Sequence, residues 1–395
     1  MSRRVRSVLG LIVLLSLITA ACTGGGSQAD AAGESIVVGA IFDLSGDTAE
    51  VGTPYADGVR AYVEWRNANG GVGGRQIDLR FQDYAYRVPQ AELLYSQYLS
   101  EGAVAFQGWG TADTEALRIK VTQDRIPFMS ASYAETLTDA AQTPYNFVVA
   151  LSYSDQMRIA LQHIADVTDG HVEVAVFHHD SPFGTSPIED GRAYIRQRGL
   201  DIGYQTYAMA ASATDYVGEL SRAEQQGADF IIIQNVSGTA ATLARNVRDQ
   251  GLDARILCLN WCGDELFIEL AGDAVAEGAL GVLPFAPPAG VTGDTTGLAA
   301  WLRQSGHHLE DLNLHFTQGW YTMHVMAEGI ARVVASGVDV TGEAIKLALE
   351  SLAPIETPVT TAISFSADCH KGMRSGQVYQ VEGGAWTPIG DVLTP

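Results

Sequence analysis

Apolar runs of strand length alternate with amphipathic helical segments along most of this chain. The first run, residues 35–42, reads Ser-Ile-Val-Val-Gly-Ala-Ile-Phe, and the segment that follows at 55–69 carries apolar residues at helical spacing. The pattern predicts further elements in the order strand 77–81, helix 89–99, strand 103–107, helix 112–123 and strand 126–130. A β-α-β-α-β series favours a parallel sheet covered by helices on both faces, so the predicted fold class is α/β.

A second series of the same kind begins after Tyr153. Its predicted elements are helix 154–168, strand 172–178, helix 184–198, strand 202–207, helix 214–226, strand 229–233, helix 238–250 and strand 255–259. A strand at 280–285, three helices at 297–305, 315–335 and 341–351, and a tail of short strands with glycine turns complete the chain. Two similar halves and a mixed tail predict two lobes between which the chain crosses more than once. Ligands of such folds bind beyond the carboxyl ends of the strands.

The N-terminus has the pattern of a secretory signal. Arg3, Arg4 and Arg6 precede an apolar run that ends in small residues just before Cys22. A basic start and an apolar core of this length predict a signal peptide over residues 1–21 and not a membrane-spanning helix. Residues 22–34 are small and polar, which is typical of a flexible tether. The alternative is a plain secreted protein in which Cys22 is incidental.

The charge balance narrows the class of partners. The chain has 46 acidic and 24 basic side chains and a formal net charge of −22 over 395 residues. Such an excess of negative charge disfavours nucleic acids and anionic membrane surfaces as partners. The length exceeds what one hydrophobic core usually serves, which agrees with two lobes.

Three cysteines follow Cys22, namely Cys258, Cys262 and Cys369. We expect structural thiols, with Cys258 buried on a strand and Cys262 near Cys369, because a zinc site at Cys258 and Cys262 would need two further ligands at similar spacing. His178, His179 and Asp180 end a predicted strand and are the other candidate metal ligands. Ordinary hydrogen bonding at a strand end is the favoured interpretation, so neither a metal nor a cofactor is predicted.

Aromatic and hydroxyl side chains gather where predicted strands end. In the run after strand 103–107, Gly110 lets a ligand approach the backbone, Thr111 is expected to cap the next helix, and free N–H groups there suit a carboxylate. Asp113 either complements the helix dipole or meets a cationic part of the ligand. The alternative is an ordinary turn with Trp109 packed in a core. The predicted ligand-binding residues are Ser45, Trp109, Gly110, Thr111, Ser130, Ala131, Ser132, Tyr133, Phe183, Asn235, Ser237, Asn260 and Trp261.

Catalytic signatures are missing from the sequence. It contains no nucleophile elbow, Walker loop, zincin motif or dinucleotide fingerprint after a strand. Aromatic residues and neutral hydrogen-bonding groups outnumber charged ones at the strand ends, which is typical of an orienting pocket. The sequence therefore predicts a binding protein and no catalytic residue.

Several short runs in a shared order carry a family resemblance. They are Gly39 to Gly46, Asn67 to Arg75, Gln82-Asp83, Gly108 to Thr114, Ile126-Pro127, His179-Asp180, Phe183-Gly184, Gly227 to Asp229 and Ala276 to Gly278. In these runs the chain resembles the extracytoplasmic substrate-binding proteins of ABC transporters of the branched-chain amino-acid (leucine/isoleucine/valine-binding) type. The resemblance implies a type I periplasmic-binding fold whose two lobes, joined by three hinge crossovers, close on a ligand. It implies lobes at 35–152 plus 284–354 and at 153–283 plus 355–395, and delivery of the ligand to an ABC permease with its ATPase.

The start of the chain carries a second resemblance. Leu17 to Cys22, Leu-Ile-Thr-Ala-Ala-Cys, resembles the lipobox of bacterial lipoproteins. This implies cleavage before Cys22, acylation of that cysteine and an extracytoplasmic protein held on the cell membrane by lipid alone, on the periplasmic side if the host has two membranes.

One departure from the family pattern bears on the ligand. The family's carboxylate cradle matches Trp109 to Thr111 and Ser130 to Ser132, but its usual acidic partner for a ligand ammonium matches Asn260 or Trp261. The expected ligand is an amino acid, an aromatic or aliphatic carboxylate, or an amide, and Asp113 or Asp264 would have to supply the charge for an ammonium. Two alternative functions stay open, namely a ligand-sensing receptor of the same fold and an extracytoplasmic hydrolase or metalloprotein built on the histidines or cysteines.

Overall fold

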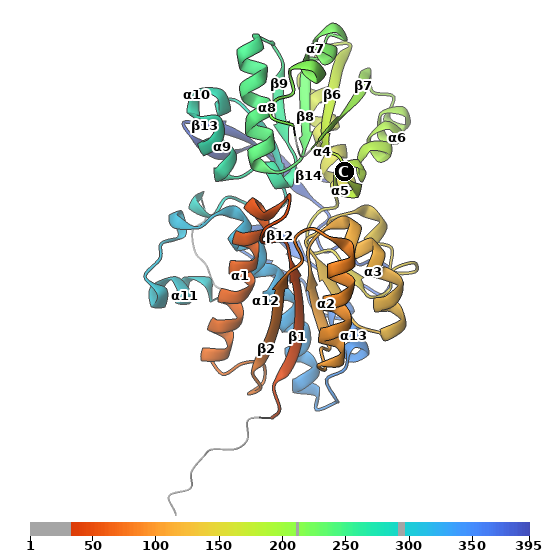
Figure 1. The fold of residues 1–395 in the computed structure, drawn as a ribbon, viewed down its shortest axis with the longest axis vertical. Helices are drawn as coiled ribbons and strands as arrows, with labels where there is room; N and C mark the ends of the chain where they lie inside the picture. Colours follow the sequence, from red (N-terminus) through yellow and green to blue (C-terminus); the bar gives the residue numbers. More distant parts are fainter. Residues whose placement is uncertain (1–32, 211–212, 291–296) are drawn as a thin grey trace, which may run out of the picture.

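The computed structural model describes residues 33–210, 213–290 and 297–395, which form two α/β lobes stacked along the long axis (Figure 1). The predicted signal peptide 1–21, Cys22 and nearly all of the tether lie outside the described residues. The first lobe contains a parallel sheet with the strand order β2 (Ile77–Asp83), β1 (Ile36–Phe42), β3 (Ala105–Gly108), β4 (Phe128–Ser130) and β5 (Asn146–Phe147). Strand β1, which lies between β2 and β3, is almost wholly buried because helices cover both faces.

Helices from both ends of the chain build the first lobe. They are α1 (Ala49–Ala68), α2 (Val88–Ser100), α3 (Thr111–Asp124), α11 (Leu298–Ser305), α12 (Leu314–Ser336) and α13 (Gly342–Glu350), with the short turns η1 (Glu135–Leu137), η3 (Pro288–Gly290) and η4 (Leu309–Asp311). Helices α1 and α12 pack side by side although they are far apart in sequence. The late segment therefore completes a lobe that the early segment began.

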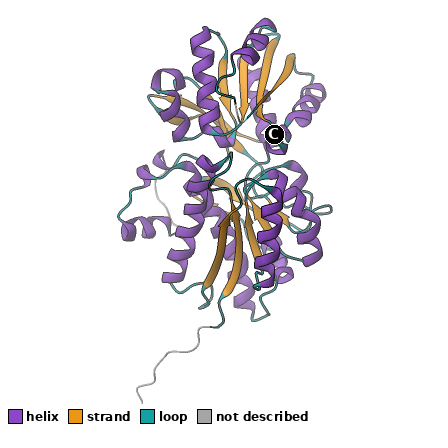
Figure 2. Cartoon of the chain, viewed as in Figure 1, coloured by secondary structure: helices purple, strands orange, loops and turns teal. Residues whose placement is uncertain are grey.

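The second lobe contains a larger, mixed sheet. Its strands lie in the order β14 (Ala385–Leu393), β13 (Gly376–Glu382), β10 (Leu280–Leu283), β9 (Arg255–Cys258), β8 (Phe230–Gln234), β6 (Val172–His179) and β7 (Ile202–Met209). Pairing is parallel except at β13, which runs antiparallel to both of its neighbours. Its helices are α4 (Tyr153–Val167), α5 (Pro182–Thr185), α6 (Ile188–Arg198), α7 (Val217–Gln225), α8 (Ser237–Gln250), η2 (Asn260–Cys262), α9 (Glu265–Ala271) and α10 (Asp273–Ala276) (Figure 2).

The α/β class and the type I two-lobed architecture are confirmed, whereas several element boundaries differ from the prediction. The helix predicted over 184–198 is wrong, because the chain forms two helices on either side of Pro187, which has no N–H to continue the first. Helix α1 begins at Ala49 and not at Tyr55, since the Asp43 carboxylate orders the preceding turn by accepting from the Thr48 N–H at 2.9 Å. The sequence pattern gave no signal for this local contact, whose partners are five residues apart.

The chain passes between the lobes after β5, after β10 and again before β13. A small antiparallel pair, β11 (Ile355–Thr357) and β12 (Thr360–Ile363), precedes the last passage. Next to it, Lys371 pairs with Glu135 at 3.0 Å and with Asp155 at 2.5 Å, and the backbone of His370 hydrogen-bonds to Thr138 and Val148 of the first lobe. The exact lobe boundaries remain a prediction, but this cluster ties the crossing strands to each other.

The expected proximity of Cys262 to Cys369 is wrong. Cys262 is fully buried in the second lobe, where its thiol donates to the Ile233 carbonyl at 3.4 Å and lies against the thiol of Cys258. Cys369 lies on the crossing segment and accepts a hydrogen bond from Arg374 at 3.6 Å. All three thiols are free, and burial raises the pKa of the Cys258 thiol.

A buried polar network joins the two lobes. Asp264, the N-cap of α9, forms an ion pair with His315 of α12 at 2.9 Å, and both side chains are fully buried. The other ring nitrogen of His315 lies 2.6 Å from Gln318 Oε1, and Gln318 donates in turn to Asn260 Oδ1 at 2.6 Å. Both ring nitrogens of His315 face acceptor oxygens, an arrangement that favours the imidazolium form.

The contact between α1 and α12 generates the first prediction. A side-chain carbon on Gly319 would lie 1.9 Å from the Tyr55 carbonyl oxygen, whereas one on Gly218 of α7 would meet open space. We expect Gly319→Ala to lower the free energy of unfolding by roughly 2 to 3 kcal/mol. We expect the control Gly218→Ala to raise it by up to about 1 kcal/mol, because alanine is the better helix former. Urea denaturation measures both, and an unchanged midpoint for Gly319→Ala would contradict the close approach.

The ion pair between the lobes generates a pH prediction. Burial works to lower the pKa of His315, but the Asp264 carboxylate outweighs it and the pKa is raised above 6.5. The stabilisation is therefore complete below the unfolded-state pKa and is lost as the pH rises through the higher folded-state pKa. We expect His315→Gln to cost roughly 3 kcal/mol at about pH 6, and less as the pH increases. Urea denaturation of both proteins across this range tests it, and a difference that grows with pH would refute the charged state of His315.

Candidate functional site

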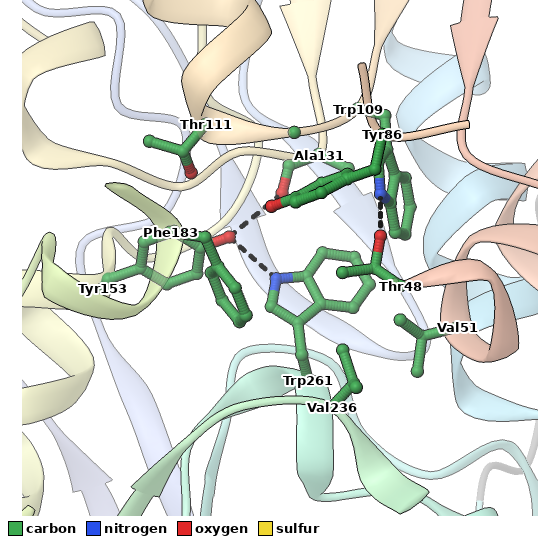
Figure 3. Close-up of a pocket in the computed structure, with 11 residues that line it drawn as sticks. Thr48, Val51, Tyr86, Trp109, Thr111, Ala131, Tyr153, Phe183, Val236 and Trp261 are labelled. Carbon is green, nitrogen blue, oxygen red and sulfur yellow. Dashed lines mark hydrogen bonds between the residues drawn. The ribbon is translucent and has the colours of Figure 1, made fainter. Parts of the chain in front are cut away.

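A small pocket lies between the lobes, where the strand ends of the two sheets face each other (Figure 3). Both lobes contribute side chains to it. Its lining residues are Thr48, Val51, Tyr86, Trp109, Gly110, Thr111, Ala131, Tyr153, Phe183, Val236 and Trp261.

A relay of hydrogen bonds positions Trp109 in the first-lobe wall. The Thr48 hydroxyl donates to Asp43 Oδ2 at 2.7 Å and accepts from the Trp109 indole N–H at 2.8 Å. Asp43 is fully buried and also accepts from the N–H groups of Gly46 and Thr48. The loop after β1 therefore fixes the indole that follows β3.

The first turn of α3 forms the hydrogen-bonding part of this wall. Gly110 is the N-cap and Thr111 the first helical residue, so the expectation that Thr111 caps the helix is wrong. The Thr111 hydroxyl instead pairs with the Ser132 hydroxyl at 2.7 Å. A side-chain carbon on Gly110 would lie 2.3 Å from Asp113 Oδ1 and 2.5 Å from the Tyr84 hydroxyl, so only glycine fits. A helix start of this kind favours an anionic group.

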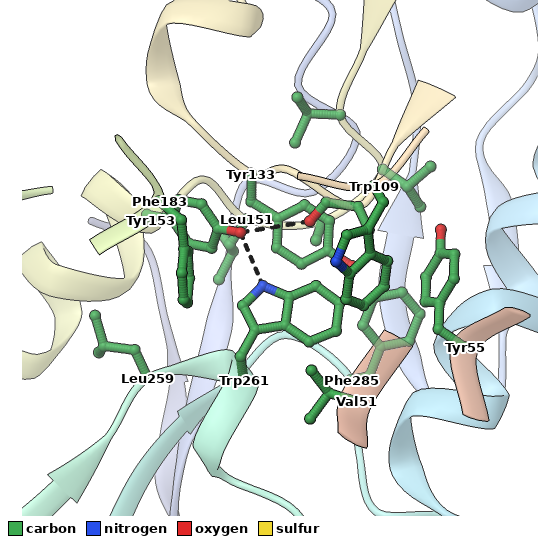
Figure 4. Close-up of a cluster of buried hydrophobic side chains, with 14 of the residues drawn as sticks. Val51, Tyr55, Trp109, Tyr133, Leu151, Tyr153, Phe183, Leu259, Trp261 and Phe285 are labelled. Carbon is green, nitrogen blue, oxygen red and sulfur yellow. Dashed lines mark hydrogen bonds between the residues drawn. The ribbon is translucent and has the colours of Figure 1, made fainter. Parts of the chain in front are cut away.

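The second-lobe wall is aromatic and centres on Trp261. The Trp261 ring stacks on Tyr133 with centroids 5.5 Å apart and on His315 at 5.0 Å, and it meets Trp109 edge to face at 5.0 Å. Its indole N–H donates to the Tyr153 hydroxyl at 2.8 Å. Figure 4 shows this cluster drawing side chains from both lobes, with Phe183 beside Tyr153. The lobes are thus in direct apolar contact around the pocket.

Two carboxylates lie near the pocket without lining it. Burial raises the pKa of Asp113 to about 7, even though Tyr84 donates to its Oδ1 at 2.8 Å. Glu50 of α1 accepts from the Gly238 N–H at 2.6 Å and so caps α8 of the opposite lobe. Burial raises the pKa of Glu50, and the hydrogen bond from Gly238 partly offsets this.

Six of the thirteen predicted binding residues line the pocket, namely Trp109, Gly110, Thr111, Ala131, Phe183 and Trp261. Others stand directly behind it, since Ser132 holds Thr111 and Tyr133 stacks on Trp261. Ser130 donates to the Ser132 carbonyl at 3.3 Å. The predicted role of each remains a proposal.

Four predicted residues have their polar groups engaged elsewhere. The Ser45 hydroxyl donates to Asp83 in an exposed loop, and Asn235 accepts from the Val236 N–H at 2.8 Å. Ser237 donates to Asp264 at 2.7 Å, and Asn260 accepts from Gln318. Strand-end position alone did not reveal that Ser237 and Asn260 serve the network between the lobes.

The structure adds five lining residues that the sequence analysis did not name, namely Thr48, Val51, Tyr86, Tyr153 and Val236. Tyr86 follows β2 with a φ of 54°, an unusual backbone conformation that its sequence does not signal. Tyr153 stands at the first crossover. The other three residues follow strands that the sequence predicted, namely Thr48, Val51 and Val236. Counting more residues after each predicted strand would have included them.

The metal candidates His178, His179 and Asp180 do not gather further ligands. His178 Nδ1 lies 3.0 Å from the His179 carbonyl, and His179 Nδ1 lies 2.8 Å from the Ser181 hydroxyl. Residues 33–210, 213–290 and 297–395 contain no group of three or more His, Cys, Asp or Glu side chains arranged to hold a metal. In the same ranges, no helix has both the length and the apolar character of a membrane span.

Comparison with known proteins identifies relatives of similar sequence and solved structures of similar fold. The chain is 24% identical over 290 residues to Leu/Ile/Val-binding protein homolog 2 of Brucella abortus (strain 2308), a match that covers 73% of this chain and 75% of the relative. The structure of a branched chain amino acid ABC transporter from Thermus thermophilus with bound valine superposes with a TM-score of 0.85 at 24% identity, covering 92% of this chain and 97% of that one. A fatty acid ABC transporter substrate-binding protein from Thermomonospora curvata superposes with a TM-score of 0.81 at 18% identity, covering 92% and 93%.

A family model described as periplasmic binding protein matches residues 35–385, which is most of the chain. The match spans both lobes and all lining residues of the pocket. With the two-lobed fold and the interlobe pocket, it shows that the chain belongs to the periplasmic binding protein family, an extracytoplasmic family of substrate-binding proteins.

Proposed function

We propose that this protein is the substrate-binding component of an ABC importer. It captures a small amino-acid-like or carboxylate-bearing solute between its lobes and delivers it, chemically unchanged, to the permease. The observation that carries the proposal is the pocket itself, whose walls come from both lobes and meet only when the lobes are together. A solute bound there links the two lobes, so its binding favours closure.

The two walls supply different chemistry. The first lobe offers the start of α3 with the Thr111 hydroxyl, which suits a carboxylate. The second lobe offers Phe183, Val236 and Trp261, which suit an apolar tail. The relative from Brucella abortus is named for leucine, isoleucine and valine, each of which combines a carboxylate with an apolar side chain.

Polar contacts between the lobes favour the closed arrangement. The Glu50 carboxylate caps α8 from across the cleft, and the Asp264–His315 pair lies behind Trp261. Glu265 of the second lobe accepts from the Leu314 N–H at the start of α12 at 2.9 Å. Separating the lobes breaks these contacts, so the state of the lobes can report to the permease whether the pocket is filled.

We further propose that Cys22 is acylated and tethers the protein to the outer face of the cytoplasmic membrane. A chain of small residues between Cys22 and β1 keeps the lobes free to move while holding them near the permease. Several acyl chains anchor a protein stably, whereas a single chain binds only marginally.

The carboxylate cradle gives a matched pair of variants. A thermal-shift panel of small solutes first identifies one that binds, and isothermal titration calorimetry then measures its affinity. We expect Thr111→Val to weaken binding roughly tenfold, because one hydrogen-bonding group of the pocket is lost. Thr122→Val, on the same helix but with its hydroxyl bonded to the Arg118 carbonyl, should bind like the wild type. A panel without any stabilising solute, or equal loss in both variants, would contradict the proposed site.

The anchor gives a separate prediction. Cys22→Ser, expressed in a host that processes lipoproteins, should move the protein from the membrane fraction to the soluble extracytoplasmic fraction. Ligand affinity should stay unchanged, because the tether lies outside the lobes. Membrane retention of the variant would refute acylation at Cys22.

A further inference from the structure

We propose that the solute is a monocarboxylate with an aromatic or branched aliphatic tail and without an ammonium group. This inference rests on the proposed function and names the class of solute that the same pocket takes. It excludes free α-amino acids, in which an ammonium stands next to the carboxylate. Burying an ammonium without an anionic partner costs free energy. An α-amino acid would therefore need a carboxylate of the protein that is free to pair with its ammonium.

The pocket-lining residues of the second lobe include no carboxylate. Phe183 and Val236 are apolar, and the Trp261 indole N–H is a donor that already serves the Tyr153 hydroxyl. The Trp261 ring is also covered by stacked neighbours, Tyr133 at 5.5 Å and His315 at 5.0 Å. A cation at this ring would lie near His315, which carries a positive charge in its protonated form.

The carboxylates around the pocket are engaged by the protein's own donors. Asp43 accepts from the Gly46 N–H, the Thr48 N–H and the Thr48 hydroxyl. Glu50 accepts from Gly238 across the cleft. Asp264 accepts from Ser237 and from the Phe267 N–H, and it pairs with His315. Recruiting any of them to a ligand ammonium would break contacts that order a loop, cap a helix or join the lobes.

Asp113 is the remaining candidate partner for an ammonium. Its Oδ2 has no hydrogen-bond partner in the protein, and it is 1% exposed. However, it stands behind Gly110 and outside the lining, with Oδ1 held by the Tyr84 hydroxyl at 2.8 Å. Burial raises its pKa to about 7, which weakens it as a charge partner for an ammonium near neutral pH.

The first-lobe wall matches the carboxylate end of the proposed solute. The start of α3 at Gly110 and Thr111 lines the pocket, and the helix dipole there favours a negative charge. The Ala131 carbonyl, an acceptor that an ammonium could use, already receives the Tyr153 hydroxyl at 3.4 Å. The pocket is therefore built with anion recognition on one wall and apolar contact on the other.

Matched pairs of ligands test the inference on the full-length protein. Isothermal titration calorimetry compares isocaproate with leucine and hydrocinnamate with phenylalanine, because the members of each pair differ only in the ammonium. We expect each acid to bind at least about tenfold more tightly than its amino acid. Isoamylamine and phenethylamine carry an ammonium and no carboxylate, and glycine betaine carries a quaternary ammonium beside its carboxylate. None of the three should bind.

Asp113→Asn serves as the matched variant, since it replaces the ionisable carboxyl group with a neutral amide of similar shape. The preference for the acids should persist in this variant. Amino acids that bind wild type as tightly as the acids, above all if Asp113→Asn abolishes that binding, would overturn the inference and leave the proposed function standing. Binding of the amines or of glycine betaine would overturn it in favour of a cation held on the aromatic rings.

Lack of binding by every compound in the set would also overturn the inference. A wider thermal-shift panel then separates the two claims. Stabilisation by any other solute would leave the proposed function standing, whereas no stabilisation by any solute would remove both.

Discussion

The Asp264 carboxylate and the His315 imidazole, which come from different lobes, meet in the interior of this protein, and the arrangement of the cleft depends on that pair. Asp264 caps α9 in the second lobe while His315 lies in the first turn of α12 in the first lobe, and neither has solvent around it. A buried charge left without its partner is strongly destabilising, so the closed lobes stabilise each charge and the pair favours the closed lobes. His315 also supports Trp261, which carries the effect of the pair to the pocket.

The pocket then follows from two ordered walls of different character. On one side, buried Asp43 orders the turn before α1 and, through Thr48, the indole of Trp109. On the other, Trp261 is held by its donor bond to Tyr153 and by rings on its faces. Because both walls are fixed by contacts inside the protein, the solute meets a preformed surface and not a flexible one.

The sequence predicted the fold well because strands buried on both faces are continuous apolar runs, as in β1 and β8, and the helices between them carry periodic apolar faces. It predicted Trp109, Gly110, Phe183 and Trp261 at the pocket because strand ends converge there. It could not show that Ser237 and Asn260 point into the network between the lobes, since that depends on α12 arriving from a distant part of the chain. The left-handed backbone of Tyr86 and the meeting of Cys258 with Cys262 likewise depend on tertiary packing.

The central claim is that the two lobes close on a solute and that contacts between them stabilise the closed state. Small-angle X-ray scattering of the purified protein, without a solute and then with a saturating one, measures this most directly. We expect a smaller radius of gyration and a shorter maximum dimension when the solute is bound, with the bound curve matching the closed arrangement of the lobes. Identical scattering curves under the two conditions, although calorimetry shows the solute to be bound, would contradict it.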